Sequence, residues 1–204
     1  ENNFNALVKK INSTNIIWEE LTTHTSSAKN INEQMLYLDS LLNGTFKTII
    51  KNKEVLGSLH LSGANNYDFI FYISAPNIET RDIIQKLKNA TKNNPSSRDY
   101  DGVTIYSFPY AENKKIALTH YKNTLAFSFS TVLVEDVIRQ LKNETNLLSD
   151  STFAQVIRTS GQATDGNIFL NNQYFSKITN QFLSKPSKAF FKDFENYTSW
   201  SELD

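Results

Sequence analysis

Apolar and polar residues alternate with a period of two along several segments of this chain. In Glu54–Ser62, Leu59 and Leu61 alternate with polar residues, which predicts a strand with one face towards solvent. Phe69–Ile73 is apolar at every position, as is typical of an interior strand covered on both faces. Similar patterns and flanking turn signals predict further strands, at Thr45–Lys51, Tyr67–Ser74, Asp99–Phe108, Lys115–Tyr121, Thr124–Ser130 and Gly166–Asn171.

Other segments have the helical period. Apolar residues at helical spacing predict an amphipathic helix over Ala28–Leu42, and the Asn43-Gly44 pair that follows is a stop signal. Further helices are expected at Phe4–Ile11, around Asp82–Asn89, and at Val132–Lys142, Ser151–Thr159, Gln173–Leu183 and Ser187–Asn196. Asn93–Ser97 (NNPSS) reads as a loop.

One segment recurs. Asp82–Thr91 (DIIQKLKNAT) reappears as Asp136–Thr145 (DVIRQLKNET), and each copy follows two predicted strands. We therefore predict a duplicated ββα element, with pseudo-repeat units at about residues 55–91 and 115–145. The predicted fold is a single α+β domain over residues 1–204, in which helices cover a mostly antiparallel sheet.

The two ends of the chain are abrupt. The first residue is Glu1 rather than Met, and the chain stops at Asp204 as though a strand were about to begin. We expect the sequence to be a fragment of a longer chain.

Charge and composition exclude several classes of protein. The chain has 21 basic and 21 acidic residues, so it lacks the long-range field that draws proteins to nucleic acid, and we predict no nucleic-acid partner. Its apolar runs are far shorter than the roughly 20 residues that cross a bilayer, so no transmembrane segment is expected. The absence of cysteine excludes disulfides, cysteine-ligated zinc and a thiol nucleophile.

The histidines have no metal or catalytic spacing. His24 lies in a loop rich in Ser and Thr, whereas His60 and His120 lie on predicted strands. If the two hairpins were adjacent, His60 and His120 could bind a metal together with Asp68. The alternative is that they are ordinary strand residues, and on that basis we predict no metal and no cofactor.

Carboxylates offer a second route to chemistry. Asp99 and Asp101 flank Tyr100 just before Gly102, so they could act in acid–base chemistry or hold calcium, although Asp-Gly is also a common turn signal. Glu19 and Glu20 beside Trp18 suggest a sugar subsite, or simply a helix anchored by one tryptophan. The sequence has no phosphate loop and no nucleophile elbow, so we assign no catalytic residue.

The C-terminal segment is dense in aromatic residues. Exposed aromatics could stack on sugar rings or anchor a partner protein; they could also close the core of this domain or face a missing neighbour. The candidate binding patch consists of Phe190, Phe191, Phe194, Tyr197 and Trp200.

Four segments resemble a known family: Ile16–Leu21 (IIWEEL), Leu118–Leu141 (LTHYKNTLAFSFSTVLVEDVIRQL), Leu147–Val156 (LLSDSTFAQV) and Trp200–Asp204 (WSELD). They resemble a family of exported envelope proteins from Bacteroides-like bacteria, described as a domain of unknown function. The resemblance implies an extracytoplasmic protein of the periplasm or cell envelope, often anchored near its N-terminus, with β-rich sequence downstream. It carries no catalytic residue over to this chain.

Two functional hypotheses remain. The first is a non-enzymatic extracytoplasmic binding or scaffold module of a larger bacterial envelope protein, whose partner is a downstream domain, another envelope protein or a glycan. The second is a hydrolase with dispersed acidic residues such as Asp99, Asp101, Glu19 and Glu20, which would be directed at glycans. A deep pocket lined by two carboxylates would favour the enzyme, and a shallow surface with exposed aromatics would favour binding.

Overall fold

The chain divides into two compact parts, described separately below. The computed structural model describes residues 33–34, 36–37, 53–63, 66–144, 146–161, 167–182, 196 and 198–203. One part, the sheet unit, comprises residues 33–144; the other, the second unit, comprises residues 1–32 and 145–204. The prediction of a single domain over residues 1–204 stays a prediction.

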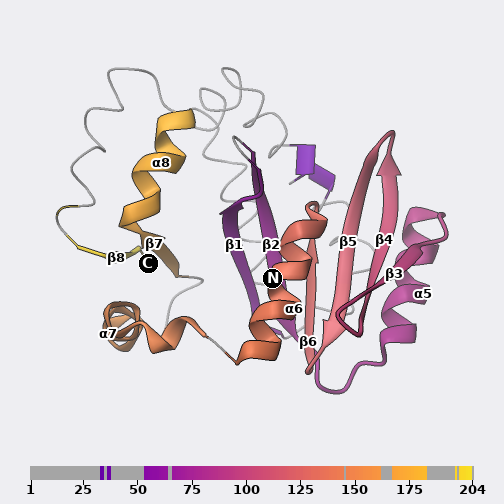
Figure 1. Cartoon of the computed structure of the whole chain (residues 1–204), viewed down its shortest axis with the longest axis horizontal. Helices are drawn as coiled ribbons and strands as arrows, with labels where there is room; N and C mark the ends of the chain where they lie inside the picture. Colours follow the sequence, from indigo (N-terminus) through magenta and orange to yellow (C-terminus); the bar gives the residue numbers. More distant parts are fainter. Residues whose placement is uncertain are drawn as a thin grey trace. The chain divides into compact units, whose positions relative to one another are not determined.

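The sheet unit is built on one antiparallel sheet. Its described residues form six strands in the order β1-β2-β6-β5-β4-β3 (Figure 1). The elements are β1 (Val55–Leu61), β2 (Tyr67–Ser74), α5 (Thr80–Thr91), β3 (Ser96–Tyr100), β4 (Val103–Ala111), β5 (Lys114–Tyr121), β6 (Thr124–Ser128) and α6 (Thr131–Asn143). This confirms the predicted α+β fold with an antiparallel sheet and helices.

Helix α6 covers one face of this sheet. Its apolar side chains Val134, Val137 and Ile138 belong to one buried cluster with Ile70 of β2 and Ala126 of β6. A large aliphatic side chain that is fully buried contributes about 1.5–3 kcal/mol, so this contact fixes α6 to the centre of the sheet.

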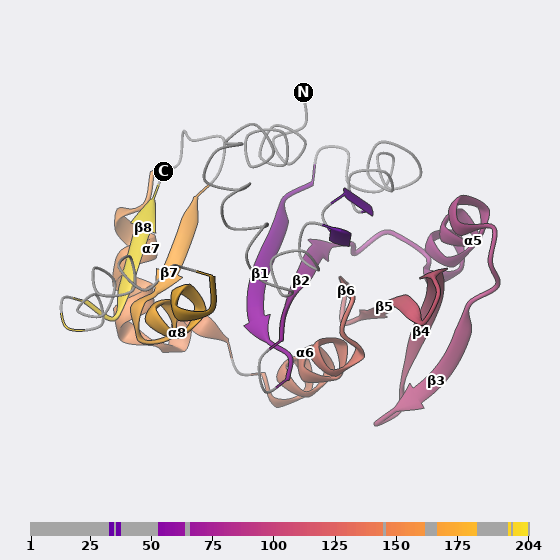
Figure 2. The ribbon, with the colours of Figure 1, turned by 90° about the horizontal axis from the view of Figure 1, so that it is seen from above.

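Helix α5 lies on the opposite face. Along β5, His120 points away from the α6 side because residues alternate in a strand, and its Nδ1 lies 2.9 Å from Thr80 Oγ1 at the start of α5. Ile83 and Leu87 of α5 are buried, and the helix contacts β4. Figure 2 shows α5 and α6 on opposite sides of the sheet.

The duplicated ββα element is therefore not shown. The β1–β2 and β5–β6 hairpins meet in the middle of the sheet, where Tyr72 of β2 pairs with Ala126 of β6. The sequence separation of this pair is the same as that of Asp82 and Asp136, the first residues of the two similar segments. However, α6 packs over its own hairpin, whereas α5 packs against β4 on the other face. The connections differ: Ser128 and Thr131 bound a short link before α6, and a longer one from Ser74 to Thr80 lets α5 cross to the other face.

The predicted strand Asp99–Phe108 is wrong, because a turn divides it. Asp101 and Gly102 both have positive φ, at 52° and 74°, which is the conformation of a two-residue type I′ hairpin turn favoured by Asp-Gly. Two strands, β3 and β4, therefore replace one. Strand β3 also begins at Ser96, inside the expected loop Asn93–Ser97.

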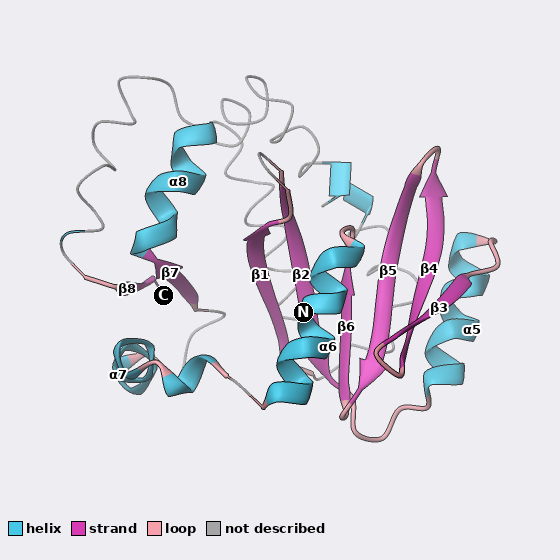
Figure 3. Ribbon diagram, viewed as in Figure 1, coloured by secondary structure: helices cyan, strands magenta, loops and turns pink. Residues whose placement is uncertain are grey.

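The second unit contains a small sheet with short helices. Its described elements are the 3₁₀ turn η2 (Leu147–Ser149), α7 (Ser151–Thr159), β7 (Ile168–Asn171), α8 (Asn172–Phe182) and β8 (Trp200–Leu203). β7 and β8 pair antiparallel, and Figure 3 shows these strands in magenta and the helices in cyan. The Phe153 ring on α7 meets those of Phe169 and Trp200 edge to face, with centroids 5.4 and 4.8 Å apart.

Several predictions fall outside the described residues. They are the helix Phe4–Ile11, the helix Ser187–Asn196 except for its last residue, the strand Thr45–Lys51, most of the helix Ala28–Leu42, and residues Trp18, Glu19, Glu20 and His24. Within the part of the chain that is described, no helix is long and apolar enough to cross a membrane.

Candidate functional site

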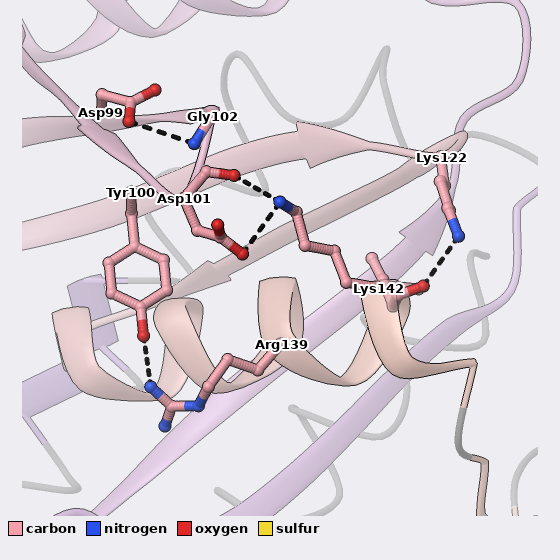
Figure 4. A network of polar contacts seen from close by, with 8 residues as sticks. Asp99, Tyr100, Asp101, Gly102, Lys122, Arg139 and Lys142 are labelled. Carbon is pink, nitrogen blue, oxygen red and sulfur yellow. Dashed lines mark hydrogen bonds and ion pairs between the residues drawn. The ribbon is translucent and has the colours of Figure 1, made fainter.

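The carboxylates of Asp99 and Asp101 both have structural partners, one in the β3–β4 turn and one on α6. Asp99 Oδ1 accepts a hydrogen bond from the Gly102 amide at 3.1 Å, and Asp101 Oδ2 lies 2.8 Å from Lys142 Nζ. Figure 4 shows both contacts. The hydrogen bond with Asp101 raises the pKa of Lys142. The turn interpretation of these aspartates is confirmed.

The polar contacts of α6 continue along the helix. The Tyr100 hydroxyl accepts a hydrogen bond from the Arg139 guanidinium (Figure 4), and the guanidinium carbons of Arg98 and Arg139 lie 5.7 and 5.9 Å from the Tyr100 ring centroid. Arg98 also pairs with Glu135. Arg139 in turn pairs with Asp136 on the same helix, so each arginine has an acidic partner. The contacts of Arg98 and Tyr100 therefore fasten the β3–β4 hairpin to α6.

His60 and His120 do not form a metal site. β2 and β6 lie between their strands, which places the backbones about 14 Å apart at the usual strand spacing. His120 Nε2 lies 3.1 Å from the carbonyl oxygen of Ala75, so this ring ties β5 to the segment before α5. No group of three or more His, Cys, Asp or Glu that could hold a metal occurs within the described ranges.

Ser58 and His60 share one face of β1. Ser58 Oγ lies 2.6 Å from His60 Nε2, which is the distance of a nucleophile from its general base. Asp68 pairs with His60 across the strands, but its carboxylate bonds to Gln34 and Ser62 instead. A third group that orients the imidazole is therefore not shown.

Of the five residues of the predicted aromatic patch, the structure describes Trp200. Trp200 is half-buried, packs on Phe153, and its Nε1 donates a hydrogen bond to Asp150 Oδ2 at 3.2 Å. Phe190, Phe191, Phe194 and Tyr197 lie outside the described residues. The patch stays a prediction, and Trp200 has a structural role in the second unit.

Asp150 positions the start of α7. Its carboxylate accepts hydrogen bonds from the amides of Thr152 and Phe153 and from the Thr152 hydroxyl. The side-chain hydrogen bond from Thr152 is the largest of the effects that lower the pKa of Asp150. This carboxylate therefore joins α7 to β8 through Trp200.

A polar and aromatic cluster lies where β2 begins and β4 ends. We call it the Asp68 cluster, and it consists of Glu33, Gln34, Tyr37, Ser62, Asp68, Tyr110, Lys114 and Phe129. Asp68 Oδ1 accepts a hydrogen bond from Gln34 Nε2 at 2.6 Å, and its Oδ2 accepts one from the Ser62 hydroxyl. The rings of Tyr37 and Tyr110 stack with centroids 4.2 Å apart. In this cluster, acidic and aromatic side chains of the sheet unit come together.

Burial and charge perturb Tyr110 within the cluster. Desolvation raises the pKa of Tyr110 to about 12, and the charges of Tyr37, Glu33 and Asp68 add to the effect. These acidic groups therefore surround the phenol. Gln34 is only 2% exposed, and its Oε1 has no hydrogen-bond partner.

A surface pocket of about 390 Å³ lies at the start of α5, lined by Glu79, Thr80, Arg81 and Asp82. It contains none of the predicted site residues, and its residues are those expected of an exposed first helical turn.

Sequence reasoning missed the Asp68 cluster, although signals for it exist. Asp68 interrupts the apolar run of its strand, and Gln34 sits beside the apolar stripe of the helix predicted over Ala28–Leu42. The two residues are 34 positions apart, so their contact depends on the tertiary fold. Asp68 had been considered only as a partner for histidines.

Comparison with known proteins identifies one family. The family described as "Protein of unknown function (DUF3352)" has a sequence model that matches residues 73–198. Searches of curated proteins and of solved structures gave no significant match. The match spans the larger part of the chain and reaches across both units.

Proposed function

The chain belongs to the family described as "Protein of unknown function (DUF3352)", and from this premise we propose that it is a non-enzymatic binding or scaffold module. The module belongs to a larger bacterial envelope protein and works outside the cytoplasm. Its partner is a downstream domain of the same chain or another envelope protein. The extracytoplasmic location rests on the resemblance of the four sequence segments to exported Bacteroides-type envelope proteins.

The apolar surface of the second unit carries this proposal. Ile168 and Leu203 form a cross-strand pair between β7 and β8, yet they are 47% and 54% exposed. Four more large apolar side chains of this unit are exposed: Leu147, Leu148, Ile157 and Tyr174. Apolar side chains gathered in one small unit favour a surface that another protein covers.

The engaged carboxylates support a binding role over catalysis. A general acid or base needs a carboxylate that is free to exchange a proton with a substrate. Asp99 is committed to its turn and Asp101 to Lys142. The side chains that the hydrolase hypothesis invokes in the described part of the chain therefore have structural partners.

The hydrolase alternative keeps one observation, the contact between Ser58 and His60. It requires turnover of an ester or glycan substrate that Ser58→Ala abolishes. The binding proposal expects no such turnover from the purified chain. An assay of the wild type and of Ser58→Ala on a panel of ester and glycoside substrates distinguishes the hydrolase hypothesis from the binding proposal.

Photocrosslinking of the full-length protein in its native cells tests the binding role. A benzophenone amino acid is placed at Tyr174 or Leu203, and at the exposed Gln85 of α5 as the matched control. We expect products of one defined mass from the first two positions, which are resistant to protease added to intact cells and are digested by protease added to spheroplasts. Equal labelling at all three positions, or products formed with cytoplasmic proteins alone, would contradict the proposal.

A further inference from the structure

Strand β1 is one edge of the sheet, and β3 is the other (Figure 2). Among the described residues, β1 pairs with β2 alone. The Ser62 amide donates to the Asn66 carbonyl oxygen at 2.8 Å, and pairs that exchange hydrogen bonds recur at every second residue of an antiparallel ladder. The even-numbered residues of β1 therefore bond β2. The N–H and C=O groups directed to the outer side are those of Val55, Gly57, Leu59 and Leu61.

The sequence of β1 lacks the usual protection of an edge strand. Natural edge strands are commonly short, or carry charged residues, Pro or a bulge that prevents pairing with another chain. β1 has seven residues (VLGSLHL), with no Lys, Arg, Asp, Glu or Pro, and it pairs with β2 without a shift in register. Leu56, opposite Tyr72, lies on the α6 face and Leu61 on the other, and they are 60% and 57% exposed. Such an edge favours pairing with a further strand.

The opposite edge has the protection that β1 lacks. β3 has five residues (SSRDY), and its central residue is Arg98. If two β3 strands paired antiparallel over their full length, Arg98 of one copy would lie opposite Arg98 of the other. Like charges that are directly opposed across strands are destabilising. The two edges of this sheet therefore differ in their capacity to pair with themselves.

Two β1 strands are complementary to each other. When they pair antiparallel over their full length, a twofold axis passes at Ser58, the fourth of the seven residues. Gly57 then lies opposite Leu59 of the second copy, and Val55 opposite Leu61. These are the residues with outward N–H and C=O groups, so each outward donor of one copy meets an acceptor of the other. No charged side chain faces another along this ladder.

We propose that β1 pairs antiparallel with β1 of a second copy of this chain, about a twofold axis at Ser58, and that this pairing joins the sheets of the two copies into one. A twofold contact uses the same patch on both copies, and twofold dimers are the commonest soluble assemblies. Leu56 meets His60 of the second copy on the α6 face, and Leu61 meets Val55 on the other face. Both exposed leucines of the edge therefore gain an apolar or aromatic neighbour.

Single cysteine variants of the full chain test the register, because the chain has no cysteine of its own. Residues opposed in a non-hydrogen-bonded pair have Cα atoms about 4.5 Å apart, within the range of roughly 4.4–6.8 Å that a disulfide spans. Ser58→Cys is therefore expected to give mainly a disulfide-linked dimer under mild oxidation with copper phenanthroline, as seen on a non-reducing gel.

His60→Cys is the matched control, on the same face of the same strand. In the proposed register its two copies are offset by four residues, which is about 13 Å along the strand, so this variant should remain without a disulfide. Equal crosslinking of His60→Cys and Ser58→Cys, or no crosslinking of Ser58→Cys, would overturn the proposal.

Sedimentation equilibrium measures the assembly without a cysteine. We expect a reversible monomer–dimer equilibrium of the wild type. Ser58→Lys opposes two ammonium groups at the axis and should weaken the dimer by about tenfold or more. Ser97→Lys, at an exposed position of β3, is the matched control and should leave the dimer unchanged.

A wild type that stays monomeric at every concentration would contradict the proposal, and so would equal dimerisation of the two lysine variants. A monomer would point instead to a different occupant of this edge, either the strand predicted over Thr45–Lys51 or a strand of another protein. The dimer goes beyond the binding role proposed for the second unit and is measured independently of crosslinking at Tyr174 and Leu203, so either proposal can fail alone.

Discussion

The two units differ in how they bury apolar side chains. In the sheet unit, α6 covers one face of the sheet and α5 lies on the other, and the largest fully buried side chains of the described residues all belong to it. In the described part of the second unit, Phe153 is the one buried apolar side chain, and Asn172 is the one buried polar residue. Among the described residues, six large apolar side chains of the second unit are exposed, against four of the sheet unit.

We interpret this difference as a division of roles, in which the sheet unit provides folding stability and the second unit provides the surface for the proposed partner. The sheet unit has an apolar core of its own, and burial of apolar area is the main favourable contribution to folding. The second unit is organised by rings around Phe153 and by polar contacts, such as those from Asn172 Nδ2 to Thr198 O and Ser201 Oγ. The exposed apolar side chains of its described part are the surface to which the proposal assigns a partner.

The largest expected effect comes from truncation of a core ring in each unit. Phe127 is 2% exposed and stacks on Phe71 with centroids 5.2 Å apart, so Phe127→Ala should lower the free energy of unfolding by about 3–5 kcal/mol. Phe153→Ala should leave the main unfolding transition in place and change the environment of Trp200 alone. Urea unfolding followed by circular dichroism and by Trp200 fluorescence, in a Trp18→Phe background, measures both.

A shared loss of the main transition in both variants would contradict this separation. It would mean that the two units unfold as one cooperative body and that Phe153 supports the sheet as much as Phe127 does.

Alkaline pH should act on the sheet unit. Burial raises the pKa of Tyr72 to about 12, and burial with nearby negative charges raises that of Tyr110 to about 12, against about 10 in an unfolded chain. The unfolded state therefore loses these protons first, and stability falls as pH rises from about 10 to 12. Tyr72→Phe should reduce the slope of stability against pH in that range, measured by urea unfolding; an unchanged slope would count against burial of this phenol.

Acid should act on the second unit. Hydrogen bonds hold the pKa of Asp150 below its usual range, so its contribution is present above the unfolded value of about 3.9 and is lost as pH falls through the lower folded value. Trp200 fluorescence should shift below about pH 4 while the circular dichroism of the sheet persists. Asp150→Asn should abolish that shift, and a shift of the same size in the variant would refute the role of Asp150.

The smallest expected effect is on the apolar pair of the second unit. Ile168→Ser with Leu203→Ser should change stability by no more than about 0.5 kcal/mol, because both side chains are exposed. The same pair should lower crosslinking to the partner at Tyr174. A thermal melt and the crosslinking yield measure the two effects, and a large drop in melting temperature with normal crosslinking would reverse the interpretation.

The sequence predicted the centre of the fold well. The alternation in Thr124–Ser130 and the apolar run Phe69–Ile73 correspond to β6 and β2, because buried strands impose their pattern directly on the residues. The turn signal at Asp101-Gly102 was recognised, yet one strand was predicted through it over Asp99–Phe108, so β3 was merged with β4. Local signals name a turn without showing which strands it separates.

Other features depend on the tertiary fold. The similar sequences that begin at Asp82 and Asp136 lie in α5 and α6, on opposite faces of the sheet, since the helical pattern specifies an apolar stripe but not the surface that it meets. The contact of Gln34 with Asp68 likewise joins distant residues. Of the predicted aromatic patch, Trp200 is the described member, and its half-burial on Phe153 follows from pairing of β8 with β7.

Hydrogen exchange of the full chain, measured peptide by peptide, tests the separation of the two units most directly. Amides exchange at rates set by the free energy of local opening. We predict strong protection in β2, β4, β5 and β6 and weaker protection throughout α7, β7 and α8 in the absence of a partner. Equal protection of both sets would contradict the account, because it would show that the second unit is as well closed as the sheet unit.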